Sequence, residues 1–172
     1  RHGITIKPIH VNESEYDCSV DHSTQAPSIR IGLSYLKSLS HSVAQEVINE
    51  RRFRAFESPC DLLSRCKISR TAVEALISIG AFEGVDCTGW EHVLPVTASQ
   101  QISAQLRHTG LSIRHPLDMV AAHLKAEGCV QARDIAQTPH GNTVTVVGLR
   151  EQAQTPRTRS HKRTCFLTLE DP

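Results

Sequence analysis

Apolar residues recur at helical spacing in three short stretches of the first half of the chain. Serine residues precede these stretches at Ser40, Ser58 and Ser69, and a serine side chain accepts hydrogen bonds from the free N–H groups of a helix start. A spacing of 3.6 residues behind such a cap predicts three short helices joined by tight turns, in a compact unit over residues 29–83. The three stripes are Val43, Ala44, Val47 and Ile48, then Leu62, Leu63 and Cys66, and then Ala72, Val73, Leu76 and Ile77.

The sequence on either side of this unit has weaker patterns. Residues 1–28 begin with a faint alternation of apolar and polar positions and predict an extended lead-in. Glycines and a proline interrupt any period after the helical unit, and the single Trp90 is expected to be a packing anchor. Helices are then predicted at residues 99–108 and after Pro116. We therefore interpret residues 84–138 as a linker with helices.

The period changes near the end of the chain. Residues 143–149 are rich in β-branched side chains and follow a turn cluster, so they predict a strand, and residues 165–169 predict a second one. Two strands do not make a stable independent sheet, so residues 139–172 are interpreted as the start of an incomplete β domain. The fold class is predicted to be α+β, with no internal repeat.

Charge is distributed unevenly, although the formal net charge is only +1. Residues 8–22 contain four acidic and no basic residues, a net charge of −4. Residues 51–70 contain six basic and two acidic residues, and residues 150–163 contain five basic and one acidic residue, so each stretch has a net charge of +4. Such basic stretches attract phosphates. The alternative interpretation is two solvated polar faces, and charge alone does not decide between them.

Several classes of function are disfavoured by what the sequence lacks. It contains no phosphate loop, no Gly-x-Ser-x-Gly and no Asp-x-Asp pair for two metal ions, so we expect no catalytic activity from this stretch. Six scattered cysteines without a Cys-x-x-Cys pair indicate reduced thiols of a cytoplasmic protein and no metal site. No apolar run is long enough to span a membrane. The start at Arg1 lacks an initiator methionine and a secretory signal, and we interpret the sequence as a piece of a longer protein.

Residues 33–40, followed by the helix predicted from Ser40, have the layout of a helix-hairpin-helix element. In such an element the turn and the following helix N-terminus offer backbone N–H groups to one phosphate without reading bases. The alternative is an ordinary helical turn in a core.

Short sequence motifs along nearly the whole chain occur in the same order as in a known family. The chain resembles the bacterial C-family DNA polymerases, the DNA polymerase III alpha subunits, in the part that follows the polymerase core. The sequence Thr-Gly-Leu-Ser at residues 109–112, shortly before His115-Pro116, is more similar to the error-prone branch of that family than to the main replicase. The motifs are residues 1–18, with Arg1-His2-Gly3-Ile4, Val11-Asn12 and Asp17-Cys18, and then residues 29–39, 74–82, 109–117, 146–149 and 166–171.

This resemblance implies a helix-hairpin-helix domain that grips duplex DNA, followed by an OB-fold near single-stranded template. It also implies that the catalytic aspartates and their Mg²⁺ lie in an upstream palm domain, so this stretch itself needs no cofactor. The parent protein would carry out template-directed synthesis during replication and repair of damaged DNA. The residues expected to contact duplex DNA are Lys37, Ser38, Ser40, Arg51, Arg52 and Arg70, and those expected to contact single-stranded DNA are Arg150, Arg157, Arg159, Lys162 and Arg163.

The hairpin departs from the family pattern. The family has Lys-Gly-apolar-Gly where this chain has Lys37-Ser38-Leu39-Ser40. Glycine permits left-handed backbone and close approach of a phosphate, and serine does so poorly. This difference puts DNA contact at the hairpin in question.

A second hypothesis is a protein-interaction scaffold that binds a polymerase partner or a sliding clamp. Residues 101–106, Gln-Ile-Ser-Ala-Gln-Leu, are weakly similar to a clamp-binding peptide but lack its terminal aromatic residue. The alternative interpretation of this segment is a plain amphipathic helix. Loss of DNA binding with salt separates the two hypotheses, because only the first depends on phosphate contacts.

Overall fold

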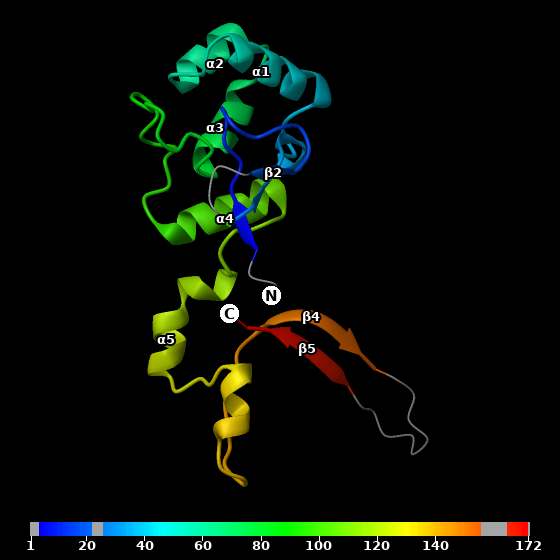
Figure 1. The fold of residues 1–172 in the computed structure, drawn as a ribbon. Helices are drawn as coiled ribbons and strands as arrows, with labels where there is room; N and C mark the ends of the chain where they lie inside the picture. Colours follow the sequence, from blue (N-terminus) through cyan, green and yellow to red (C-terminus); the bar gives the residue numbers. More distant parts are fainter. Residues whose placement is uncertain (1–3, 22–25, 156–164, 172) are drawn as a thin grey trace. The chain divides into compact units, whose positions relative to one another are not determined.

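The computed structural model describes residues 4–21, 26–155 and 165–171. They belong to two compact units, Arg1–Ile113 and Arg114–Pro172, which we treat one at a time (Figure 1). Within the described part of the chain, no helix combines the length and the apolar character needed to cross a membrane.

The three predicted helices are present in the first unit. They are α1 (His41–Phe53), α2 (Pro59–Arg65) and α3 (Arg70–Ser78), and the predicted serine caps are confirmed. The Oγ atoms of Ser40, Ser58 and Ser69 accept from the N–H groups three residues ahead. The apolar stripes meet in one core, and Gly80 follows α3 with a φ of 85°. Val47, Leu62, Leu76 and Ile77 are each at most 1% exposed, and Val43 packs half-buried against them.

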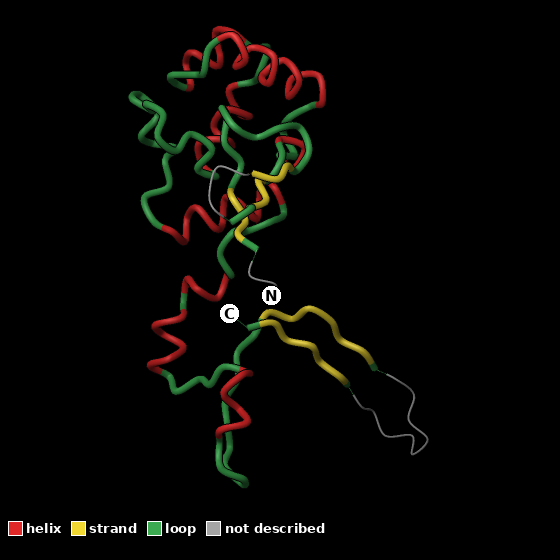
Figure 2. Tube along the Cα trace, in the orientation of Figure 1, coloured by secondary structure: helices red, strands yellow, loops and turns green. Residues whose placement is uncertain are grey.

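The lead-in expected to be merely extended is integrated into this unit. Strands β1 (Thr5–Lys7), β2 (Ser19–Asp21) and β3 (Ser28–Arg30) form a sheet in the order β1-β3-β2, with β1 parallel and β2 antiparallel to β3 (Figure 2). Between β1 and β2, Ile9 and Val11 are buried in the helical core. These apolar side chains leave water only by docking on the helices, which a reading of local pattern did not reveal.

A 3₁₀ turn, η1 (Leu33–Tyr35), connects the sheet to α1. After α3 the chain runs through an irregular segment to α4 (Ala98–Thr109), which packs against α3. Trp90 in this segment is 4% exposed, and its indole donates to the Sγ atom of Cys60 at 3.4 Å, so its predicted role as a packing anchor is confirmed. Helix α4 begins with a capping box between Thr97 and Gln100 and ends at Gly110, whose φ is 78°.

The second unit contains η2 (Pro116–Met119), α5 (Ala121–Ala126), η3 (Ala132–Gln137) and an antiparallel pair of strands, β4 (Leu149–Gln154) and β5 (Phe166–Glu170). Strand β5 was predicted within one residue, but the strand predicted at residues 143–149 is wrong. Strand β4 begins at Leu149, because β5 pairs with residues 149–154 and not with the β-branched residues before them. β-Branched composition indicates extended backbone, but the position of the partner decides where a ladder forms.

Candidate nucleic-acid interface

The predicted hairpin lies between η1 and α1. The N–H of Leu39 donates to the carbonyl of Leu36 at 3.0 Å, which closes a turn whose tip is Lys37-Ser38. Leu36 is 1% exposed and anchors the turn in the core, whereas Lys37, Ser38 and Ser40 are exposed. The start of α1 therefore faces solvent beside one ammonium group and two hydroxyl groups. A helix start presents free N–H groups and positive partial charge, which suits an anion.

Ser40 does not occupy a backbone conformation that requires glycine. Its φ is −74° and its ψ is 156°, which is ordinary extended backbone for the residue before a helix. Its Oγ accepts from the N–H of Val43 at 3.4 Å, a long hydrogen bond. The serine at this position thus causes no backbone strain and is weakly engaged as a cap. Ser40 therefore differs from the glycine of the family pattern only in the bulk of its side chain, which a phosphate approaching the backbone would meet.

Lys37 joins the hairpin to the end of α4. Its N–H donates to the carbonyl of His108 at 3.0 Å, and its Nζ donates to the carbonyl of Arg107 at 3.3 Å. Burial lowers the pKa of His108 below its ordinary value, and the positive charges of Arg107 and Lys37 lower it further. The positive potential at this place therefore comes from groups 70 residues apart in the sequence.

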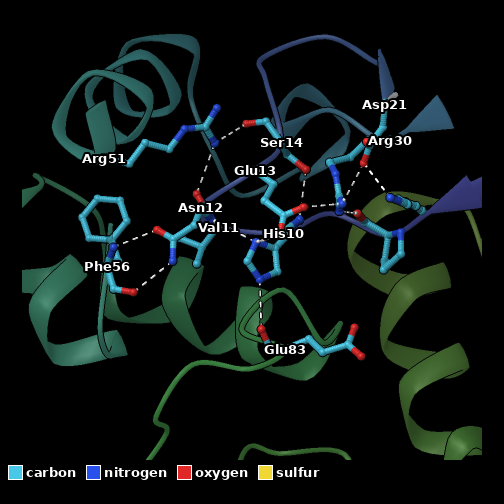
Figure 3. A network of polar contacts seen from close by, with 12 residues as sticks. His10, Val11, Asn12, Glu13, Ser14, Asp21, Arg30, Arg51, Phe56 and Glu83 are labelled. Carbon is cyan, nitrogen blue, oxygen red and sulfur yellow. Dashed lines mark hydrogen bonds and ion pairs between the residues drawn. The ribbon is translucent and has the colours of Figure 1, made fainter. Parts of the chain in front are cut away.

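Arg51, in contrast, points into the protein (Figure 3). Its guanidinium donates to the carbonyls of Val11 and Ser14 and to the carboxylate of Glu15, the last at 2.8 Å. Its side chain is 8% exposed. Burial lowers the pKa of Arg51, and the neighbouring Glu15 carboxylate opposes that effect. This arginine holds the lead-in to α1, and its donors are already occupied.

Most of the other basic side chains at residues 51–70 also pair with carboxylates, although Arg54 and Arg70 do so at the surface. Arg70 pairs with Glu74 at 3.2 Å, and its guanidinium lies 4.8 Å from the centre of the Trp90 ring. Arg54 and Arg65 both pair with Asp61. Among the described residues, the basic side chains of this stretch without a hydrogen-bond or ion-pair partner are those of Arg52 and Lys67. Lys37, Ser38, Ser40 and Arg52 are thus the predicted duplex contacts that are exposed and have no carboxylate partner in the described part of the chain.

A polar network that the sequence analysis missed fixes the loop between β1 and β2 (Figure 3). The Asn12 side chain accepts from the N–H of Phe56 at 2.7 Å and donates to its carbonyl at 3.0 Å. Arg30 pairs with Glu13 and Asp21. These contacts span 9 to 44 residues of sequence, so no local pattern signals them. The acidic stretch at residues 8–22 is therefore largely a set of internal partners for arginines.

The other predicted binding residues are separate from this region. Arg150 lies in strand β4, although the sequence predicted that the strand ends at residue 149 and that Arg150 belongs to the basic stretch between the two strands. Arg157, Arg159, Lys162 and Arg163 lie outside the described residues.

The segment with weak similarity to a clamp-binding peptide, residues 101–106, is part of α4. Ile102 is 3% exposed there, and Gln105 is buried and donates to the carbonyl of Ile79. A partner would have to unfold α4 to bind this segment as an extended peptide. In the part of the chain that the structure describes, no group of three or more His, Cys, Asp or Glu residues is placed to hold a metal ion.

Comparison with known proteins gives a consistent result. Residues 3–89 match the family model described as helix-hairpin-helix motif. The chain is 29% identical to the error-prone DNA polymerase of Alkalilimnicola ehrlichii, 30% to that of Xanthomonas oryzae pv. oryzae and 29% to that of Pseudomonas aeruginosa. Each similarity covers 99% of this chain but 19% of the relative, so the chain spans about a fifth of the length of the curated relatives it matches. The aligned stretches are 198 to 205 residues long, more than the 172 residues of this chain.

Proposed function

Because the chain belongs to the helix-hairpin-helix family and resembles error-prone DNA polymerases along nearly its whole length, we propose that it is the DNA-binding region of a C-family error-prone polymerase. The parent protein would perform template-directed DNA synthesis in the replication of damaged DNA, in the cytoplasm, with Mg²⁺ held by a palm domain that this sequence does not include. The stretch described here would hold DNA and carry out no chemistry.

The observation that carries this proposal is the hairpin at the start of α1. Lys37, Ser38 and Ser40 are exposed around a helix start within the range that the family model covers. The helix supplies N–H groups, the serines supply hydroxyl donors and the lysine supplies a full positive charge. Together they suit one phosphate of duplex DNA, without any preference for the bases.

Arg52 is the second proposed contact. It lies in the last turn of α1, is exposed, and has no partner among the described residues. Arg51, expected from the sequence to touch a phosphate, is buried and paired with Glu15. Arg70 is exposed and pairs with Glu74 on the same helix, so it stays a predicted contact.

The pair β4 and β5 is proposed to be the start of an OB-fold that meets single-stranded template. The pair has a register irregularity between Arg150 and Gln152, a feature that is common at the rims of barrels. The sequence between the two strands contains Arg157, Arg159, Lys162 and Arg163, a charge pattern suited to a single strand.

The test is binding of the full chain to fluorescent duplex DNA, measured by anisotropy at low salt. We expect micromolar or tighter binding that is equal, within about twofold, for two duplexes of unrelated sequence. Lys37→Gln should weaken it several-fold, while Lys125→Gln, an exposed charge on α5, should change it much less. Equal effects of the two substitutions would contradict the role of the hairpin, and absence of binding by the wild type would contradict the function itself.

A further inference from the structure

Two long stretches of the first unit contain no acidic residue. Residues 22–45 and residues 92–113 lack aspartate and glutamate entirely, although the chain has 18 acidic residues in 172. At the average frequency, two or more acidic residues would be expected in each stretch. The first stretch contains the hairpin, and the second contains α4.

The fold brings these two stretches together. Lys37 from the first donates through both its N–H and its Nζ to the carbonyls of His108 and Arg107 in the second. The N–H of Gly110 donates to the carbonyl of Leu106. These three bonds occupy the carbonyls of Leu106, Arg107 and His108 at the end of α4, which would otherwise repel an anion. The side chain of Arg107 beside them is exposed.

A shallow groove without acidic residues continues from this point along α4. It is lined by Ser99, Ser103, Arg107 and His108 of α4 and by Ser78 at the end of α3, and none of its lining residues is acidic. The hydroxyls of Ser99 and Ser103 and the guanidinium of Arg107 have no hydrogen-bond or ion-pair partner within the described ranges. These exposed donors contrast with the arginines of α1 and α2, most of which are engaged by carboxylates.

We propose that this groove is a second phosphate-binding site, continuous with the hairpin, and that the backbone of one strand of duplex DNA runs from Lys37 along α4. Arg107 pairs with a phosphate, and Ser103 and Ser99 donate to the phosphates that follow. From Ser99 to Arg107 the helix rises about 12 Å, so the three side chains stand about 6 Å apart along the axis, close to the separation of successive phosphates along one strand. The proposal rests on the proposed function and extends it, since the hairpin alone provides a single phosphate contact.

The charge of Arg107 provides the first test. The salt dependence of the DNA affinity gives the number of phosphate contacts, because each contact contributes about 0.9 to the slope of log affinity against log salt. Over a fourfold rise in salt, from 50 to 200 mM, one contact therefore accounts for about a 3.5-fold loss of affinity. We expect the wild type to lose about 3.5-fold more affinity over this range than Arg107→Gln does. Arg54→Gln removes an equal charge that is paired with Glu57 and Asp61, and it should keep the wild-type slope.

A carboxylate placed in the groove provides the second test. Ser103→Glu should weaken duplex binding tenfold or more, because it puts a negative charge where the phosphates pass. Ser64→Glu is the matched control, an exposed helical serine on α2, and should weaken binding no more than about twofold. Thermal unfolding of both variants shows whether either change acts through the fold.

The outcomes separate the two proposals. Binding that depends on Lys37 but is affected equally by Arg107→Gln and Arg54→Gln, and equally by Ser103→Glu and Ser64→Glu, overturns the groove and leaves the hairpin in place. A wild-type chain that does not bind duplex DNA at 50 mM salt overturns both.

Discussion

Arg51 and Arg52 are neighbours in α1 with opposite surroundings. Arg51 donates to two carbonyl groups and one carboxylate of the lead-in, while Arg52 is exposed and unpaired within the described residues. The difference follows from helix geometry, since successive residues point about 100° apart and only Arg51 faces the connection between β1 and β2. The positive charge of Arg51 thus has a structural role, whereas that of Arg52 is free to meet a ligand.

Substituting the two arginines separately tests this contrast. Arg51→Ala should lower the free energy of unfolding by about 1 to 3 kcal/mol, because it leaves the carbonyls of Val11 and Ser14 without their donor. Arg52→Ala should change it by less than about 0.5 kcal/mol, as expected of an exposed position. Urea unfolding of both variants measures the values. A cost for Arg51→Ala as small as that for Arg52→Ala would show that the docked lead-in is not stabilised through this side chain.

Cys66, at the end of α2, should be chemically inert. Burial raises the pKa of its thiol to about 11, with Glu46 and Glu50 adding to the effect. At pH 8 the thiolate form is then about one part in a thousand, and the thiolate is the reactive species. We expect Cys66 to resist a thiol reagent at pH 8 until the protein unfolds, while the exposed Cys18, Cys60 and Cys165 react. Mass spectrometry of the labelled peptides decides this, and labelling of Cys66 as fast as Cys60 would contradict the packing described.

The helices are the elements best predicted from the sequence, because their signals are local. Ser40, Ser58 and Ser69 each bond an N–H three residues ahead, so cap and stripe lie within a few residues of each other. The docked lead-in and the start of β4 were not predicted, since both depend on partners far along the chain. Asn12 meets Phe56 across 44 residues, and only the folded chain shows that contact.

The core formed by α1, α2 and α3 depends on the apolar stripe of α3. Leu76 is 1% exposed in the middle of the apolar stripe of α3. Leu76→Ala should lower the free energy of unfolding by about 2 to 5 kcal/mol, through lost burial and the cavity left behind. Thr71→Ala is the control, an exposed position on the same helix, and should cost little. Chemical unfolding with a loss below about 0.5 kcal/mol for Leu76→Ala would mean that the stripe faces solvent.

The hairpin is the element where sequence and family pattern differ. Restoring glycine at Ser38 and Ser40 removes two hydroxyl donors but lets the backbone N–H groups come closer to a phosphate. We expect the closer approach to outweigh the lost donors and duplex binding to tighten by about 1 kcal/mol. Folding stability should fall by a few tenths to about 1 kcal/mol, because the cap is lost and the unfolded chain gains freedom. The fall should be at the lower end, since the Ser40 cap is long at 3.4 Å. Unchanged DNA affinity together with lowered stability would mean that the hairpin is only structural here.

At the scale of the whole molecule, the charge map differs from what the sequence suggests. The basic stretch at residues 51–70 is largely paired with carboxylates, and the outward positive groups gather instead where the hairpin meets α4. The sequence located the hairpin, because Ser40 and the apolar stripe behind it are contiguous. It did not locate Arg107 or the groove, because their significance depends on the distant Lys37.

The chain as a whole is expected to bind DNA without extending it. Its sequence contains no Asp-x-Asp pair, and its resemblance to polymerases lies outside the part expected to hold the catalytic aspartates. In a primer-extension assay with Mg²⁺ and all four nucleotides, the purified chain should therefore give no product above the protein-free control. Extension that persists after a second, independent purification would contradict this assignment.

The most direct test of the account is the salt dependence of duplex binding by the wild-type chain. If Lys37, Arg52 and Arg107 each neutralise one phosphate, the slope of log affinity against log salt should be about −2.7, which is roughly a 40-fold loss between 50 and 200 mM salt. The loss should be the same for duplexes of unrelated sequence. Binding that is absent at 50 mM salt, or that changes less than about twofold over this range, would contradict the claim that this protein holds DNA through its phosphates.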